Sequence, residues 1–334
     1  MRTKLIFIIS FLFFLSCGNK KKGKENIDVF EFQFQQEIQI EADSIFTNEI
    51  FEINGWVHVD SFLFIQSTNT DTIFYMYSTP NLTFKKSFGL RGQGPDDYLY
   101  PHITTDHLNR VYIYDNGNKK FQTIQISENA PVIENQSILK EAEIFNFLGY
   151  IENSLFCIKK ENPNSISLNL YQIVSNETKL LSSLKIIEEA NGESHEKDFV
   201  VTNNKRCLFV AYLHQKVVEF YQINEENKFH KKFVYSDEKD LDVNEYHYTD
   251  ICSSDHSIYA LYQGMKKQEI SQSASKSTVE VFDKNGKIEM KFRLDRLIKR
   301  IMIDNNGRIL YAISPYESDY IYKYDLSKMR KNSL

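Results

Sequence analysis

The amino-acid sequence predicts an all-β protein, a six-bladed β-propeller with four antiparallel strands in each blade. Three observations support this prediction: a strand–turn–strand signature recurs six times, an alternating apolar strand follows each copy, and helical patterning is nearly absent. The composition agrees, because Phe, Tyr and Trp make up 14% of the 334 residues and aromatic side chains favour strands.

Residues 1–16 have the pattern of a signal peptide. Arg2 and Lys4 precede an apolar run at 5–15, which is shorter than the roughly twenty residues of a transmembrane helix. Ser16 and Cys17 follow this run directly, and a small residue before Cys resembles the lipobox of bacterial lipoproteins, although Phe14 stands where Leu is usual. The resemblance implies cleavage before Cys17 and a lipid on its thiol. A short uncleaved anchor and an ordinary signal peptide are the alternatives.

Residues 17–26 are expected to form the lipidated Cys17 and a flexible tether, because NKKKGKE contains no core-forming residue. Two or more acyl chains anchor a protein stably, so the predicted location is the cell envelope, with lipid attachment to a bacterial membrane. In Bacteroidetes-type lipoproteins an acidic stretch after the Cys accompanies surface export. The basic stretch here therefore favours the periplasmic side of the outer membrane, and surface exposure is the alternative.

Residues 27–334 are predicted to form the propeller, because the six signatures are evenly spaced. Their anchor positions are separated by about 48, 44, 53, 50 and 52 residues. Four strands at a period near fifty are typical of propeller blades, whereas a pair of β-sandwiches would not explain even spacing. The strongly alternating stretch 31–40 could add the outer strand of the last blade and so close the ring. The anchors are Leu63, Val111, Leu155, Leu208, Ile258 and Leu310.

The stretch FGLRGQGPDDYLYPH, residues 88–102, is predicted to be a crossover between the first two blades. It lacks the G-K-[ST] of a P-loop and leads into a strand rather than a helix, so a phosphate-binding role is excluded. The first interpretation is a structural turn, in which glycines permit φ values closed to other residues and prolines fix the path. These residues are Gly89, Gly92, Gly94, Pro95 and Pro101.

The second interpretation of this crossover is a ligand-binding loop, because crossovers open on the face where propellers commonly bind ligands. Arg91 could bind a carboxylate through two hydrogen bonds, and the acidic side chains could accept from hydroxyls or cations. The candidate binding residues are Arg91, Gln93, Asp96, Asp97 and His102.

The crossover also carries a family resemblance. FG-x-x-G-x-GP, followed by an acidic residue, an aromatic residue and Pro, resembles the G-x-x-G-x-GPGEF-x-x-P phrase of NHL-type six-bladed propellers. Together with the lipobox, the chain resembles TolB-like six-bladed propeller lipoproteins of Bacteroidetes-type bacteria. Asp96, Asp97 and Tyr98 stand where Gly-Glu-Phe is usual. The resemblance implies the fold and brings no characterised activity.

The sequence offers no catalytic or metal site and calls for no cofactor, since it has no H-x-H, H-E-x-x-H or G-x-S-x-G motif. The favoured function is a non-catalytic binding or scaffold module for a protein, peptide or glycan. The alternative is a lactonase- or lyase-like, metal-assisted enzyme whose site lies in the central channel. Nucleic acid is not an expected partner, because the formal net charge is −5.

The proposed lipid attachment predicts that Cys17→Ala will release the protein from membranes or leave its signal peptide uncut. Fractionation of cells and the migration of the protein on a gel will check this. A variant that fractionates and migrates like the parent protein would show that Cys17 carries no lipid.

Overall fold

The computed structural model describes most of residues 27–327; the ranges outside it are 48–51, 69, 106–109, 128–129, 139–146, 153–154, 163–164, 175–176, 189–198, 238–241 and 271–274. The signal peptide, Cys17 and the tether therefore lie outside the described residues. Within the described part, no helix is long and apolar enough to cross a membrane.

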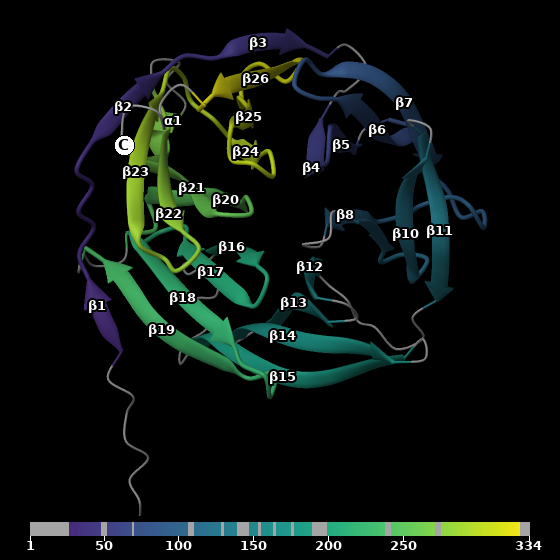
Figure 1. Cartoon of the computed structure of the whole chain (residues 1–334), viewed down its shortest axis with the longest axis horizontal. Coiled ribbons are helices and arrows are strands. Elements are labelled where there is room, and N and C mark those ends of the chain that lie inside the picture. Colours follow the sequence, from purple (N-terminus) through teal and green to yellow (C-terminus); the bar gives the residue numbers. More distant parts are fainter. Residues whose placement is uncertain are drawn as a thin grey trace, which may run out of the picture.

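Six sheets stand around a ring, which confirms the predicted six-bladed propeller (Figure 1). The first blade consists of β4 (Ile53–Val59), β5 (Phe62–Ser67), β6 (Thr72–Ser78) and β7 (Thr83–Leu90). The second blade consists of β8 (Pro101–Thr105), β9 (Val111–Asp115), β10 (Lys120–Ser127) and β11 (Ala130–Ile138). The third blade consists of β12 (Phe147–Glu152), β13 (Leu155–Asn162), β14 (Ser165–Val174) and β15 (Glu177–Glu188).

The other three blades follow the same antiparallel order. The fourth blade contains β16 (Phe199–Asn204), β17 (Cys207–Tyr212), β18 (Val217–Ile223) and β19 (Phe229–Ser236). The fifth blade contains β20 (Glu245–Ser253), β21 (Ser257–Lys266), β22 (Thr278–Asp283) and β23 (Ile288–Leu294). The sixth blade contains β24 (Arg300–Ile303), β25 (Ile309–Ile313) and β26 (Tyr320–Asp325). A short helix, α1 (Lys267–Ile270), follows β21.

The core lies between the blades. Each of six buried apolar clusters combines side chains from two neighbouring blades. The six anchor positions are all buried in the second strand of their blades, and adjacent residues of one strand face opposite neighbours. Leu63 thus packs with Tyr311 of the last blade, and Phe64 packs with Ile113 of the second. Period-2 alternation therefore supplies both faces of every sheet.

The N-terminal segment closes the ring in a different way from the predicted one. β3 (Asp43–Phe46) pairs with β26 and completes the last blade. The stretch expected to do this, 31–40, instead contains β2 (Glu37–Ile40), which adds a fifth, parallel strand to β23. β1 (Asp28–Phe30) adds another parallel strand to β19. Two blades therefore have five strands rather than the predicted four.

The residues between β1 and β2 seal the gap between the fourth and fifth blades. Phe32 and Phe34 pack against an aromatic cluster drawn from both blades, with ring centroids 5.4 Å apart for Phe32 and Tyr235 and 6.3 Å for Phe34 and Phe282. Lys216 places its Nζ 4.5 Å from the centre of the Phe32 ring. We call residues 28–46 the strap (Figure 1).

The strap predicts different outcomes for two truncations. A chain that starts at residue 43 should keep a closed ring and unfold cooperatively at a lower temperature, because it loses only the added outer strands and the Phe32–Phe34 seal. A chain that starts at residue 48 also loses β3 and exposes the edge of β26, so it should aggregate. Thermal melts and size-exclusion chromatography will compare the two, and equal behaviour would mean that β3 does not hold the ring closed.

Candidate functional site

The crossover between the first two blades is a closed loop. Residues 91–100 connect the end of β7 to the start of β8. Tyr98 donates its N–H to the Leu90 carbonyl at 2.9 Å, and Gly92 donates to the Tyr98 carbonyl at 3.1 Å. The Tyr98 ring is buried and meets Phe74 edge to face at 5.3 Å. The two ends of the loop are therefore fixed beside one another.

Two buried charged residues of the second blade hold this loop in place. The Asp115 carboxylate, fully buried, accepts hydrogen bonds from the N–H groups of Leu99 and Tyr100 at 3.0 and 2.8 Å. The Lys120 ammonium, also buried, donates to the Pro95 carbonyl at 2.9 Å and also to that of Asp97. Sequence reasoning missed both residues, although they flank the turn 116–119 that faces the loop.

The three glycines of the crossover serve it for two different reasons. Gly89 has a φ of +75°, the left-handed conformation expected for it. The same expectation is wrong for Gly92 and Gly94, because neither has a positive φ. A Cβ there would instead lie 2.2 or 2.7 Å from Oδ2 of Asp97, and this carboxylate accepts a hydrogen bond from the Gly94 N–H at 2.9 Å. Asp97 is therefore part of the loop structure.

A pocket of about 110 Å³ opens beside the loop, at the junction of the first two blades. Of the five predicted binding residues, the structure brings Arg91 and His102 together in its wall. Gln93 and Asp96 are exposed and do not line it, and Asp97 folds back on the loop. Pro95 is exposed and Pro101 is buried. The remaining lining residues are Asn54, Gln66, Ser67, Thr68, Ile73, Leu99, Tyr100 and Pro101.

Arg91 enters this pocket wall as an unpaired cation. Its Nη2 donates to the Thr68 carbonyl, and its backbone N–H donates to the Asp71 carbonyl at 2.9 Å. These two bonds hold the residue at the end of β7. No carboxylate among the described residues forms an ion pair with it.

The opposite wall is positioned by Gln66, which joins the two blades. Its side-chain amide donates to the Pro101 carbonyl at 2.7 Å and accepts from the Ile103 N–H at 3.2 Å, so it fixes the backbone on both sides of His102. Burial lowers the pKa of the His102 ring, although the charge of Asp115 acts in the opposite direction. Burial therefore favours the neutral form of this imidazole. The neighbouring Ser67 hydroxyl is fully buried and has no hydrogen-bond partner among the residues that the structure describes.

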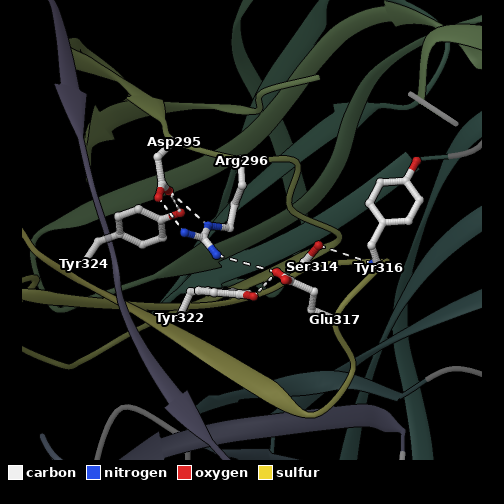
Figure 2. A network of polar contacts seen from close by, with 7 residues as sticks. All are labelled: Asp295, Arg296, Ser314, Tyr316, Glu317, Tyr322 and Tyr324. Carbon is white, nitrogen blue, oxygen red and sulfur yellow. Dashed lines mark hydrogen bonds and ion pairs between the residues drawn. The ribbon is translucent and has the colours of Figure 1, made fainter. Parts of the chain in front are cut away.

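The crossover between the last two blades contains a second arginine, and its environment is the reverse of that of Arg91. Figure 2 shows that Arg296 forms two hydrogen bonds with Asp295, at 2.7 and 3.2 Å, and an ion pair with Glu317 at 3.6 Å. Its guanidinium also lies 3.9 Å from the centre of the Tyr322 ring. Tyr324 donates to the same Asp295 carboxylate at 2.7 Å. This arginine is satisfied within the protein and ties the two blades together.

The histidines of the inner strands do not converge on one point. His58 lies near Asn305 and Thr79, at 3.4 and 3.2 Å, beside the turns of the opposite face. His247 is 3.7 Å from Glu245. Across the described ranges, no group of three or more His, Cys, Asp or Glu side chains comes together. Cys157 is buried, and burial raises the pKa of its thiol to about 12.

Comparison with known proteins agrees with this architecture. The sequence model of the family described as TolB-like 6-blade propeller-like matches residues 33–306, and no curated protein matches the chain. A member of the DUF4221 family from Bacteroides vulgatus is similar in structure, with a TM-score of 0.59 at 10% identity, over 88% of this chain and 97% of that one. A presumed exported protein of Bacteroides fragilis has a TM-score of 0.54 at 8% identity, over 86% and 99%.

A third solved structure is also similar in fold. The β-propeller domain of Cps50 (Swd1) from Myceliophteria thermophila has a TM-score of 0.52 at 9% identity, over 85% of this chain and 99% of that domain. At these identities the likeness concerns the fold alone.

The loop geometry predicts that Asp115→Ala will destabilise the protein by about 3 kcal/mol, because it leaves backbone donors near the loop without their acceptor. Arg91→Ala should change the free energy of unfolding by no more than about 0.5 kcal/mol, because the side chain is exposed. Chemical denaturation will measure both. If Arg91→Ala proves as costly as Asp115→Ala, Arg91 is a structural residue.

Proposed function

The chain belongs to the TolB-like 6-blade propeller-like family, and we propose that it is a non-catalytic binding module tethered to a membrane of the cell envelope. The tether is the lipid inferred at Cys17, and the propeller recognises a protein, peptide or glycan. The fold similarity to a presumed exported Bacteroides protein is consistent with this location.

The observation that carries the proposal is a cation in a preformed pocket wall, Arg91, which forms an ion pair with no carboxylate of the described residues. Asp115 and Lys120 hold the backbone of the loop by hydrogen bonds, and the Thr68 carbonyl accepts a hydrogen bond from one edge of the Arg91 guanidinium. A partner that meets this surface therefore orders few groups on binding, which favours affinity. An internal ion pair like that of Arg296 with Asp295 would have removed this binding capacity.

The rim of the pocket supports the same interpretation. Tyr100 is 69% exposed and lines the pocket next to Leu99. Tyr and Arg are the residue types that most often dominate the energy of binding interfaces. An exposed Tyr beside an unpaired Arg is therefore suited to contact with a partner.

The arrangement favours binding over nucleophilic catalysis. Ser67 and His102 both line the pocket, but the Ser67 hydroxyl forms no hydrogen bond with His102 or with any other described residue, so the two do not form a nucleophile–base pair. The Asp115 carboxylate is occupied by Leu99, Tyr100, Gly117 and Asn118, which leaves it poorly placed to orient the imidazole.

Site-specific photo-crosslinking tests the binding face. A photoreactive phenylalanine analogue at Tyr100 of the full-length protein should give a crosslinked product in cells. The same analogue at Arg308, which is exposed in the turn before β25 on the opposite face, should not. The proposal fails if position 100 gives no product, or if both positions give the same one.

A further inference from the structure

We propose that the pocket between the first two blades binds the C-terminal carboxylate and terminal apolar side chain of a peptide, with Arg91 as the ion-pair partner. This inference rests on the proposed function, since it assigns a ligand to the same face. It is carried by the charge of Arg91, the size of the pocket and the nature of its walls.

The charge argument begins with the donors of Arg91. A guanidinium has five N–H donors in a planar fork, which matches the two oxygens of a carboxylate. The only hydrogen bond from its side chain to the rest of the described chain is that from Nη2 to the Thr68 carbonyl. This bond orients the fork and leaves other N–H donors for an anion. Arg296 shows the alternative in the same fold, because Asp295 already fills its fork.

Two acidic groups near the pocket are occupied by donors of the protein. Glu52 accepts a hydrogen bond from the Thr68 hydroxyl at 3.2 Å, and Asp115 accepts from the backbone of the crossover. Neither of them pairs with Arg91, and no carboxylate of the described ranges does so, which is what allows a group from outside to bind there.

The volume of the pocket selects a terminal group. About 110 Å³ is well below the roughly 300–1,000 Å³ of a pocket for a drug-sized ligand, so only the end of a larger molecule can enter. A peptide C-terminus carries its carboxylate and its last side chain on one Cα. It can therefore place a charge against Arg91 and a small apolar group inside.

The walls favour this end group over an acidic sugar. Ile73, Leu99 and Pro101 line the pocket, and they offer no partner for the hydroxyls that surround a sugar ring. An unpartnered hydroxyl in such a site is costly, whereas an apolar side chain gains from burial.

Polar side chains of the walls suit the last peptide unit. Asn54 is exposed at the edge, and the ring of His102 is held in register by Gln66. Between them they can donate to and accept from the amide that precedes a terminal residue. The Ser67 hydroxyl, which bonds to no other residue of the described part of the chain, is a further polar group of this wall.

Methyl NMR on the full propeller with labelled Ile and Leu tests the proposal, because Ile73 and Leu99 are reporters inside the pocket. N-acetyl-Gly-Leu with a free carboxylate should shift both methyl signals saturably and leave Ile258 of the fifth blade unchanged. Its C-terminal amide should bind about tenfold more weakly. R91Q should weaken binding of the acid to the level of the amide, R91K should fall between, and R308Q should bind like the wild type.

Three results would overturn the inference. Equal binding of acid and amide would exclude carboxylate recognition, and undiminished binding by R91Q would exclude Arg91. Shifts with glucuronate but not with the peptide would assign the site to acidic sugars. If neither probe binds but crosslinking at Tyr100 persists, the terminal-carboxylate inference is wrong and the proposed binding face is retained. If crosslinking at Tyr100 is also lost, the proposed function itself is wrong.

Discussion

Closure of the ring by β3 is the interaction on which the rest of the structure depends. Every blade has two apolar faces, and each face is buried only against a neighbouring blade. Five of the six interblade clusters join blades that are consecutive in sequence, whereas the sixth packs Trp56 and Leu63 against Tyr311 and Ile313 of the last blade. The pairing of Ile45 with Ile321 draws the N-terminal segment into that blade. Without it, both end blades would expose a face.

The crossover shows how a propeller can build a rigid loop around buried charge. Burying a carboxylate and an ammonium is costly unless each is surrounded by hydrogen bonds. Asp115 meets this condition with the N–H groups of Leu99 and Tyr100, and Lys120 meets it with the carbonyls of Pro95 and Asp97. Asp115 therefore fixes the loop through its backbone N–H groups, and Lys120 fixes it through its backbone carbonyls. The loop fixes the position of Arg91 without an ion pair to its guanidinium among the described residues, whereas Arg296 is held by its ion pair with Asp295.

Sequence reasoning reached the fold because the blade pattern is local. Alternation within strands and the regular anchor positions are properties of short segments, and they identified six blades and the crossover. Which strand an outer strand pairs with depends on residues far away in the sequence. The alternation of 31–40 therefore could not show that Asp43–Phe46 would close the ring. In the candidate site, Arg91 and His102 were predicted because they flank the glycine-rich turn, and both line the pocket. Gln66 and Lys120 were missed, because a polar residue at an alternating strand position normally faces solvent.

The strap also determines where a tethered propeller would present its pocket. β1 runs beside β19 at the rim of the fourth blade, whereas β7 and β8 lie across the ring (Figure 1). A lipid on Cys17 is separated from β1 by ten residues, which span at most about 35 Å. The fourth blade would therefore stay close to the bilayer, and the junction of the first two blades would lie at the far rim. If both proposals hold, a peptide terminus approaching from the surrounding solution would meet Arg91 there before it met the membrane, so the proposed tether and pocket would act at the same time.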